Sequence, residues 1–457
     1  MKSTKVNGRK VTRDWTQGNI GRNLVALAWP VMVSQSLNMI GPFIDMVWVG
    51  RLGSSSVAGV GVAGLAVMLA NAALTGLTTG MRVLIGRYWG AGDKSSATHA
   101  AHQSFVIGIM YAIFIAIIGI FLAVPIVRLF GVDESVVTEG AAYLRIQFIG
   151  IITMTLLTFN EGCMQASGDT MIPMRLSIIY RITHIILCPF LIFGWWVFPE
   201  LGVRGAALSD VLTQGIGGIA GMFILFGGYS RLKLSLKNWR PDLHTLWRMF
   251  KIGLPNGFMN IQQHLSMMVL MVFIARFGTI AVASHALFQR VDSVLAILTM
   301  GVGVSAGVLG AQNLGAGKPN RAEKSGWLAA GFAGAIMLTG SIIILIWAEP
   351  IVRIFTHDPT LIEMSSKFLR IACTSYIALG VSSVFRHFMT GVGDTLPAFI
   401  MEIAFTWGLL IPLVYFSTNF TDFGIWGIRW SLALRLIMGG IIFTLYFWLG
   451  KWKSRKI

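Results

Sequence analysis

The sequence predicts an all-α integral membrane protein, with about twelve transmembrane helices in two six-helix bundles related by a pseudo-two-fold axis along the membrane normal. Composition is the first reason: 55% of the 457 residues are hydrophobic and 12% are charged, and the mean hydropathy is +0.72. So few polar side chains cannot cover a water-soluble domain of this length. The second reason is a series of apolar runs of about 20 residues, the length of a helix that crosses a bilayer. The third is an internal repeat.

The apolar runs define twelve expected spans. They cover residues 24–50, 56–82, 98–125, 138–164, 172–195, 202–228, 248–276, 280–308, 325–348, 362–388, 395–418 and 424–449. The even-numbered connections carry more Lys and Arg than the odd-numbered ones, for example Arg87 and Lys94 after the second span. Positive residues mark cytoplasmic segments. We therefore expect both termini in the cytoplasm and the chain in a plasma membrane.

The net charge of +17 could indicate a nucleic-acid-binding protein, but its distribution argues against that class. Basic residues gather in Lys2–Arg22, Arg231–Lys251 and Lys451–Lys456, which is the positive-inside pattern of a membrane protein. The first 22 residues contain no short apolar core, so we expect no removable signal peptide. The three cysteines, Cys163, Cys188 and Cys373, lie in or near apolar spans and offer neither a disulfide framework nor a metal-binding spacing.

The repeat consists of motif pairs that recur at one constant offset of 225 residues. The pairs are Pro30 and Pro255, Gly53 and Gly278, Val57-Ala58 and Val282-Ala283, Gly90-Ala91-Gly92 and Gly315-Ala316-Gly317, Val127–Phe130 and Val352–Phe355, and Gly168-Asp169-Thr170 and Gly393-Asp394-Thr395. Near the end of each half, Gly205 pairs with Gly427 at an offset of 222. A constant offset over such a length indicates two homologous halves.

Each half holds six spans, an even number, so the two halves have the same orientation in the membrane. The expected division is a cytoplasmic basic tail (1–23), an N-lobe (24–228), a cytoplasmic linker (229–247), a C-lobe (248–449) and a second basic tail (450–457). In transporters built from parallel repeats the substrate binds near the midplane between the halves, and rocking of the halves exposes it to each side in turn.

The first span carries several polar residues, which are unusual in a helix that crosses a membrane. On a helix Ser34, Asn38 and Asp45 share one face, and Pro42 leaves the carbonyl of Asn38 without its helical donor. A carboxylate inside a membrane span is costly and marks a functional site. The alternative is that Asp45 is a purely structural hydrogen-bond acceptor.

Three sets of residues resemble the multidrug and toxic compound extrusion (MATE) family over essentially the whole chain. They are PVMVSQSLNMIGPFIDMVWVGRLGSSSVAGVG, which runs from the first span into the second, GAQNLGAGKPNRAEKSG after the eighth span, and the paired Gly-Asp-Thr motifs. The motif Arg290-Val291-Asp292-Ser293 ahead of Gln312–Pro319 is similar to the prokaryotic DinF-like branch. The resemblance implies export of bulky organic compounds driven by inward H⁺ or Na⁺.

The resemblance also implies a cation site in the N-lobe. In that branch it is formed by an Asp on helix one, an Asn and an Asp four residues apart on helix five, and a Thr on helix six. Asp45 matches the first position, whereas His184, Cys188 and Asp210 stand at the other three. The acid that the sodium-coupled branch carries on helix seven is replaced by Gln263. These departures favour H⁺ over Na⁺ as the coupling ion.

The chemistry of these positions independently supports a site. At 1.5 Å per residue, Asp45, Cys188 and Asp210 lie roughly 8, 10 and 13 Å below the outer end of their spans, so they can converge. Two carboxylates in a low-dielectric pocket do not both ionise easily, and a nearby His184 adds a further titratable group. The repeat places Leu270 and Leu432 at the counterparts of the two acids, so we expect coupling in the N-lobe alone.

Several alternatives stay open for this site. Asp210 could instead be a helix-packing residue hydrogen-bonded to Ser209 or Thr213, and His184 could be a satisfied core histidine. Arg181 could neutralise either acid and abolish its titration. We assign Asp45, Asp210, His184, Cys188 and Asn38 to cation coupling.

A substrate cavity and a gate complete the expected site residues. The cavity is assigned to polar residues near the interface of the halves, with flexible methionines of the seventh span around them; they are Gln35, Asn256, Asn260, Gln263, His264, Arg290 and Asp292. The alternative is that these methionines pack against lipid or protein. Glu161 and Arg386 are related by the offset of 225, and we expect them to form an inter-lobe ion pair in the outward-open state.

The sequence thus predicts a secondary active antiporter for amphiphilic organic compounds. We expect a monomer in the bilayer that binds a small organic substrate and a coupling cation, without cofactor, metal or nucleic acid. One rival is a flippase for lipid-linked or polysaccharide precursors, with Arg181, Arg290 and Arg386 facing an anion. The other is a membrane-embedded enzyme with Cys188 and His184, which we do not favour because a thiol buried in lipid is poorly reactive.

Overall fold

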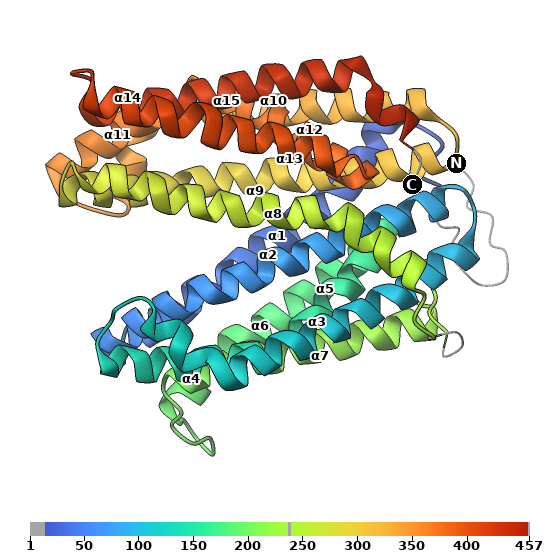
Figure 1. Cartoon of the computed structure of the whole chain (residues 1–457), viewed down its shortest axis with the longest axis horizontal. Coiled ribbons are helices and arrows are strands. Elements are labelled where there is room, and N and C mark those ends of the chain that lie inside the picture. Colours follow the sequence, from blue (N-terminus) through green and yellow to red (C-terminus); the bar gives the residue numbers. More distant parts are fainter. Residues whose placement is uncertain (1–13, 236–238, 456–457) are drawn as a thin grey trace.

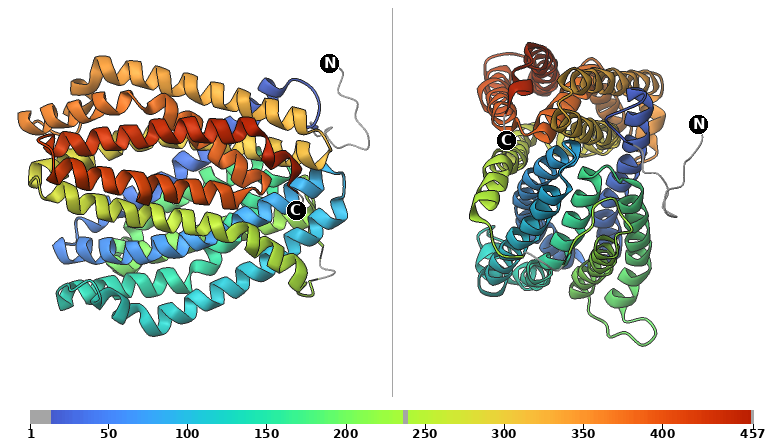
Figure 2. Two further views of the ribbon diagram at one scale, coloured as in Figure 1. Left: turned by 45° about the horizontal axis from the view of Figure 1, so that its top comes forward. Right: turned by 90° about the vertical axis from the view of Figure 1, so that its right-hand side faces the viewer.

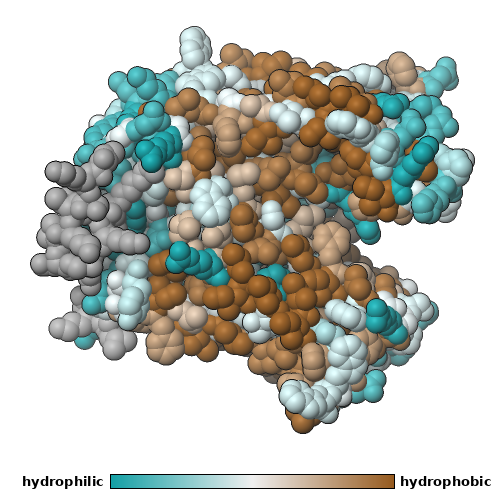
Figure 3. Space-filling model, turned by 180° about the vertical axis from the view of Figure 1, so that it is seen from behind, coloured by the Kyte–Doolittle hydropathy of each residue, from teal (hydrophilic) through white to brown (hydrophobic). Residues whose placement is uncertain are grey.

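The computed structural model describes residues 14–235 and 239–455, and within them the chain is helical with no β-strand. Ten helices are long and apolar enough to cross a membrane, and two bent helix pairs raise the number to twelve. Large apolar side chains such as Phe121 and Phe223 are about three-quarters exposed, at 72% and 73%, and apolar residues cover the flanks in Figure 3. These features confirm the expected class of a polytopic all-α membrane protein.

The helices form two bundles that lie one above the other in Figures 1 and 2. The first bundle holds α1 (Ile20–Val49), α2 (Ser54–Gly90), α3 (Lys94–Arg128), α4 (Glu134–Ile149), α5 (Ile151–Ala166), α6 (Met171–Phe193) and α7 (Val203–Gly227). The second holds α8 (Leu243–Ala275), α9 (Thr279–Gly315), α10 (Pro319–Arg353), α11 (Pro359–Cys373), α12 (Tyr376–Val392), α13 (Thr395–Ile403), a π-helical segment (Ala404–Leu410), α14 (Ile411–Asn419) and α15 (Gly424–Leu449). A short 3-10 turn, Lys451–Ser454, follows.

Two spans that the sequence predicts as single helices are bent. The pair α4 and α5 bends by 46°, and the pair α11 and α12 bends by 59°. Gly150 lies between the first two helices and Ser375 between the second two, and these residues are related by the offset of 225. At the first bend α7 comes so close that a Cβ on Gly150 would overlap the side chain of Val211. The duplication therefore extends to a detail of helix geometry that hydropathy does not reveal.

The bundles meet at the end that holds the chain termini and separate at the other end, where Figure 3 shows a deep cleft. At the closed end α2 packs closely against α8 and α9. A Cβ on Gly90 would overlap the carbonyl oxygen of Gln312, and a Cβ on Gly315 would overlap that of Arg87. Because Gly90 and Gly315 are equivalent in the repeat, the closed end is itself nearly symmetric.

Hydrogen bonds between the bundles reinforce the closed end. Gln312 Nε2 donates to the carbonyl of Ala166 at 2.7 Å, and an Arg87 amino group donates to the carbonyl of Val392 at 2.9 Å. The indole of Trp15 donates to the carbonyl of Gly168 at 2.9 Å. These hydrogen bonds lie at the closed end, so they do not hold the two bundles together at the opposite end.

The first helix does not belong wholly to one lobe. Its early residues Leu24, Leu27 and Ala28 are buried in the hydrophobic core of the second bundle, whereas its later part packs on α6 of the first. The structure describes the N-terminal tail only from residue 14, the linker without 236–238 and the C-terminal tail up to residue 455. The remaining parts of these predicted segments lie outside the described residues.

Candidate cation-coupling site

Two helices of the N-lobe bring three titratable side chains together. Asp45 comes from α1, and His184 and Cys188 come from consecutive turns of α6. Asp45 Oδ1 lies 3.2 Å from His184 Nε2 and accepts a hydrogen bond from Cys188 Sγ at 3.4 Å. All three residues are buried, with Asp45 5% exposed and the other two fully enclosed. The spacing of four residues on α6 is what turns both side chains toward one carboxylate.

Asp210 on α7 is the second carboxylate of this cluster. Its Oδ1 lies 4.0 Å from the same His184 Nε2, so the imidazole stands between the two acids. Its Oδ2 accepts hydrogen bonds from Gln214 at 2.8 Å and from Gln147 on α4 at 3.4 Å. The hydroxyls of Ser209 and Thr213 donate instead to backbone carbonyls, so the alternative in which they satisfy Asp210 is wrong.

Arg181 sets the protonation pattern of the imidazole. An Arg181 amino group lies 3.3 Å from His184 Nδ1. Because a guanidinium can only donate, Nδ1 must accept, and the imidazole is then the neutral tautomer with its proton on Nε2. Nε2 lies near both carboxylates, yet it makes no well-aligned hydrogen bond to a described residue. Arg181 forms no ion pair within 4.0 Å with either acid among the described residues, and its charge also acts directly on Asp210.

Two aromatic hydroxyls extend the polar cluster and were not predicted. Tyr180 on α6 donates to Asn38 Oδ1, and the Asn38 amide lies 3.5 Å from Gln35 Oε1. Gln147 links Tyr143 to Asp210, with 3.2 Å between Gln147 Nε2 and the Tyr143 hydroxyl. Gln147 and Tyr143 are polar residues in an apolar span, and that signal could have placed them in the site.

The geometry also suits a metal ion. One ligand atom from each of Asp45, His184 and Cys188 lies within 4.8 Å of the others. No other trio of this kind occurs in the chain outside residues 1–13, 236–238 and 456–457. Oxygen, nitrogen and sulfur donors together match the ligand set that zinc-like ions prefer.

The expected substrate-cavity residues do not form one cluster. Asn256 donates to Thr79 Oγ1 of α2 at 2.7 Å and therefore joins the two lobes, and Asn260 donates to the backbone carbonyl of Asn256 at 2.8 Å. Gln35 Nε2 approaches Met300 Sδ at 3.6 Å. His264 is half-buried and Arg290 is exposed. Only Gln263 and Asp292 line a common pocket, which lies inside the C-lobe.

The expected inter-lobe ion pair between Glu161 and Arg386 is absent from the ion pairs of the described residues. Glu161 accepts a hydrogen bond from Ser177 of its own lobe at 2.9 Å, and Arg386 lines the C-lobe pocket. The physical reason is that equivalent positions in a repeat share the same environment. Each side chain therefore faces the interior of its own bundle and not its counterpart.

The C-lobe has a polar cluster of its own, and its two arginines on α15 were not predicted. Arg429 on α15 is 3% exposed, lies 2.6 Å from His285 Nδ1, and sits over the rings of Phe368 at 3.7 Å and Phe288 at 4.4 Å. Arg435 pairs with Glu402 at 2.7 Å. Two arginines within the apolar sequence of the last span were the available signal.

Comparison with known proteins places this geometry in a family. The model of the MatE family matches residues 30–190 and 255–416, one match in each half. A probable multidrug resistance protein, YpnP of Bacillus subtilis, is 25% identical over 446 residues, covering 97% of this chain and 98% of its own length. The probable multidrug resistance protein NorM of Thermotoga maritima is 24% identical over 443 residues, covering 96% and 94%.

Solved structures share the fold. An outward-facing multidrug resistance MATE family transporter of the MOP superfamily superposes with a TM-score of 0.89 at 20% identity, over 95% of this chain and 96% of that one. A MOP superfamily transporter from Pyrococcus furiosus, described by a reversed polarity of its binding pocket, gives 0.89 at 20% identity over 97% and 98%. With both halves matched, this chain belongs to the MATE family of multidrug efflux transporters.

Proposed function

We propose that the chain is a monomeric secondary active antiporter that exports amphiphilic organic compounds in exchange for H⁺. The observation that carries the proposal is the placement of neutral His184 between Asp45 and Asp210, at 3.2 and 4.0 Å from one imidazole nitrogen. Two carboxylates in a buried pocket repel each other when both are ionised. One proton bound by the pair therefore relieves the repulsion, and its loss restores it.

The cluster gives each group a distinct part in proton exchange. Asp45 and Asp210 hold the exchanged proton, and the His184 Nε2–H stabilises whichever carboxylate is ionised. Arg181 orients the imidazole from the other side. Coupling further requires that the proton bind with different affinity in the two conformations of the transporter. Because Asp45 lies on α1, which reaches into both lobes, a change of charge at Asp45 acts on the element that joins them.

The donor set favours H⁺ over Na⁺. A hard cation such as Na⁺ binds best to several oxygen ligands. Here a thiol and an imidazole nitrogen occupy two of the positions around Asp45. The thiol donates to Asp45 and the imidazole nitrogen lies 3.2 Å from the same carboxylate, and such donors suit a site for protons better than a site for a hard cation.

The cleft supports alternating access as the mode of transport. We propose that the chain lies in a prokaryotic plasma membrane with both termini in the cytoplasm, so that the cleft at the end opposite the termini (Figure 3) faces outward. The basic residues near the closed end agree with that orientation. Export then requires the glycine-lined contact of α2 with α8 and α9 to separate as the cleft closes.

Neither rival is as well supported as the antiporter. A flippase calls for a continuous basic row along the cavity between the lobes, but Arg181 contacts His184 inside the N-lobe and Arg386 lines a pocket inside the C-lobe, so these two residues do not form such a row. A hydrolytic or transferase site calls for an activated nucleophile, whereas the Cys188 thiol donates to a carboxylate and stays protonated.

The proposal is tested with purified protein in liposomes loaded with a fluorescent organic substrate. An imposed pH gradient should drive its movement, an imposed Na⁺ gradient should not, and Asp45→Asn should abolish the response to the pH gradient. The exposed acid Asp133 of the same lobe supplies the matched control, Asp133→Asn, which should transport normally. Full pH-driven transport by Asp45→Asn would refute the proposal.

A further inference from the structure

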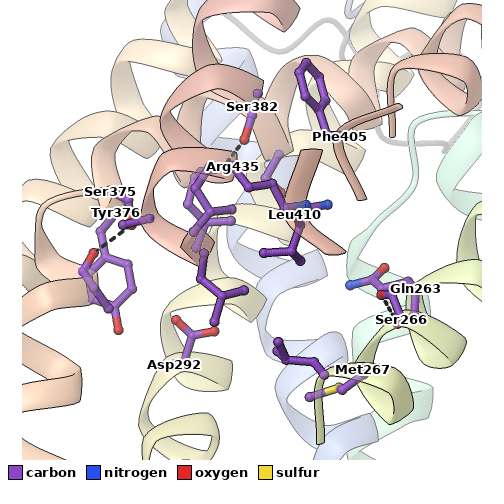
Figure 4. A pocket seen from close by; sticks show the side chains of 18 of the residues that line it. Gln263, Ser266, Met267, Asp292, Ser375, Tyr376, Ser382, Phe405, Leu410 and Arg435 are labelled. Carbon is purple, nitrogen blue, oxygen red and sulfur yellow. Dashed lines mark hydrogen bonds between the residues drawn. The ribbon is translucent and has the colours of Figure 1, made fainter. Parts of the chain in front are cut away.

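A pocket inside the C-lobe is separate from the proton cluster. It lies among α8, α9, α12 and α15 and has a volume of about 260 Å³. Figure 4 shows Asp292, Tyr376 and Arg435 converging on it, with Gln263 and Met267 on α8 at its edge. Gln263 and Met267 are exposed, and α8 runs along the side of the C-lobe that faces the N-lobe (Figure 1). The pocket is therefore reached from the region of the cleft.

The charges that line this pocket do not cancel. Three guanidinium groups, of Arg386, Arg429 and Arg435, face two carboxylates, of Asp292 and Glu402. His285 adds no charge, because its Nδ1 accepts from Arg429. Glu402 is taken up by Arg435 at 2.7 Å, and Asp292 interacts with Arg429 and Tyr376. Glu402 also interacts electrostatically with Arg386. Three guanidinium groups therefore share two carboxylates, and the pocket keeps one excess positive charge.

Donor groups in the pocket also lack acceptors. Nε and one amino nitrogen of Arg429, and Nε of Arg435, have no hydrogen-bond partner among the described residues. Arg386 forms no hydrogen bond and no ion pair within 4.0 Å among the described residues, and its charge acts on Glu402 from a longer distance. A buried donor without an acceptor costs free energy, so this arrangement is improved by an anion that enters the pocket.

We propose that this pocket binds a carboxylate group of an amphiphilic substrate, so that the transported compounds are acids or zwitterions. The inference names the chemical class of the transported compound, and it rests on the proposed export function. A planar carboxylate matches the fork of a guanidinium and gives charge-assisted bonds. The volume is below the roughly 300–1,000 Å³ of sites that enclose a drug-sized molecule. The pocket therefore takes the acidic end, while the apolar remainder lies past the flexible side chain of Met267.

Equilibrium binding to purified protein in lipid nanodiscs, without any ion gradient, tests the proposal. The probes are rhodamine 110, which carries a free carboxylate, and rhodamine 123, its methyl ester. Wild type should bind the acid at least about tenfold more tightly than the ester, the size expected for one charge-assisted hydrogen bond. Arg386→Gln should abolish the preference, and Arg386→Lys should keep part of it. Arg353→Gln, an exposed arginine of the same lobe outside this pocket, should keep all of it.

Three results would overturn the inference. The first is that wild type binds the acid and the ester equally, and the second is that it binds neither dye. The third is that Arg386→Gln lowers the affinity for both dyes alike. The last result would mean that Arg386 supports the fold, and melting curves of the variants identify it. Because binding is measured without a gradient, a failure here is independent of whether a pH gradient drives transport.

Discussion

The two lobes share a fold, but the charge of the polar cluster described in each lobe has the opposite sign. In the N-lobe two carboxylates, Asp45 and Asp210, face one guanidinium, Arg181, across a neutral imidazole. In the C-lobe pocket three guanidinium groups face two carboxylates. Neither cluster has a copy in the other lobe: the counterparts of the two acids are Leu270 and Leu432. Those of Asp292 and Arg429, in the same registers, are Val67 and Ala207.

This comparison indicates that the two halves retained the same helix packing after duplication, whereas their buried polar residues diverged. Equivalent glycines at Gly90 and Gly315 and equivalent bends at Gly150 and Ser375 are retained. A transporter needs a closing interface on both halves, but a proton site and a substrate site are each needed only once. Each of the following predictions contrasts the lobes or tests the contact between them.

The largest expected effect is loss of stability on removal of the buried C-lobe charge. Arg429→Met should destabilise the protein by about 3 kcal/mol, because Asp292 and His285 lose their partner. Asp45→Asn should cost under about 1 kcal/mol, since it removes one of two repelling acids. Unfolding curves in detergent compare them, and adding Asp292→Asn to Arg429→Met should recover part of the loss. Equal stability of the two single variants would contradict the charge difference between the lobes.

The second expected effect concerns the partner acid. Asp210→Asn should slow transport driven by a pH gradient by at least about tenfold, because a single carboxylate loses the repulsion that releases its proton. Asp292→Asn in the other lobe should leave the dependence on the gradient intact, whatever it does to substrate affinity. Initial rates at several gradients separate the two cases. A normal rate in Asp210→Asn would remove that residue from the coupling site.

The third prediction uses a soft metal as a probe of the N-lobe cluster. Cd²⁺ at micromolar concentration should inhibit transport by binding the sulfur, nitrogen and oxygen atoms of Cys188, His184 and Asp45. Cys188→Ser should be several-fold less sensitive, while Cys373→Ser in the C-lobe should match wild type. Unchanged inhibition in Cys188→Ser would show that the metal acts elsewhere.

The smallest expected effect concerns the contact between the lobes. Gly90→Ala should loosen the closed end, because the new Cβ overlaps the Gln312 backbone. The cleft should then close more often. Spin labels at Arg51 and Arg276, equivalent exposed positions beyond the ends of α1 and α8, should report a larger fraction of short distances. Gly331→Ala, where a Cβ meets nothing within 4 Å, serves as the control.

Sequence reasoning was strongest where the signal was periodic. Hydropathy and the offset of 225 predicted the spans and the two bundles, because the length of an apolar run and the spacing of a repeat can be read directly from the sequence. Depth along a span also predicted that Asp45, Cys188 and Asp210 could approach one another. The bends at Gly150 and Ser375 escaped prediction, since they depend on how closely a neighbouring helix approaches.

Sequence reasoning was weakest where rotation of a helix decides the contact. The repeat showed that Glu161 and Arg386 occupy equivalent positions, but it did not show which way their side chains point. In the structure each side chain points into its own bundle. The contact of Arg181 with His184 Nδ1, which fixes the tautomer, depends on side-chain rotamers. Arg429 was overlooked because an arginine in the last span has no counterpart in the first half to draw attention to it.

The central claim is that the N-lobe couples protons and the C-lobe pocket binds the substrate. Its most direct test measures two rates in the same liposomes: transport driven by a pH gradient, and exchange of labelled for unlabelled substrate without a gradient. Asp45→Asn should lose the first rate and keep the second, whereas Arg386→Gln should lower both rates for an acidic substrate. If Asp45→Asn loses both rates together, or Arg386→Gln loses only the driven one, the division of labour between the lobes is contradicted.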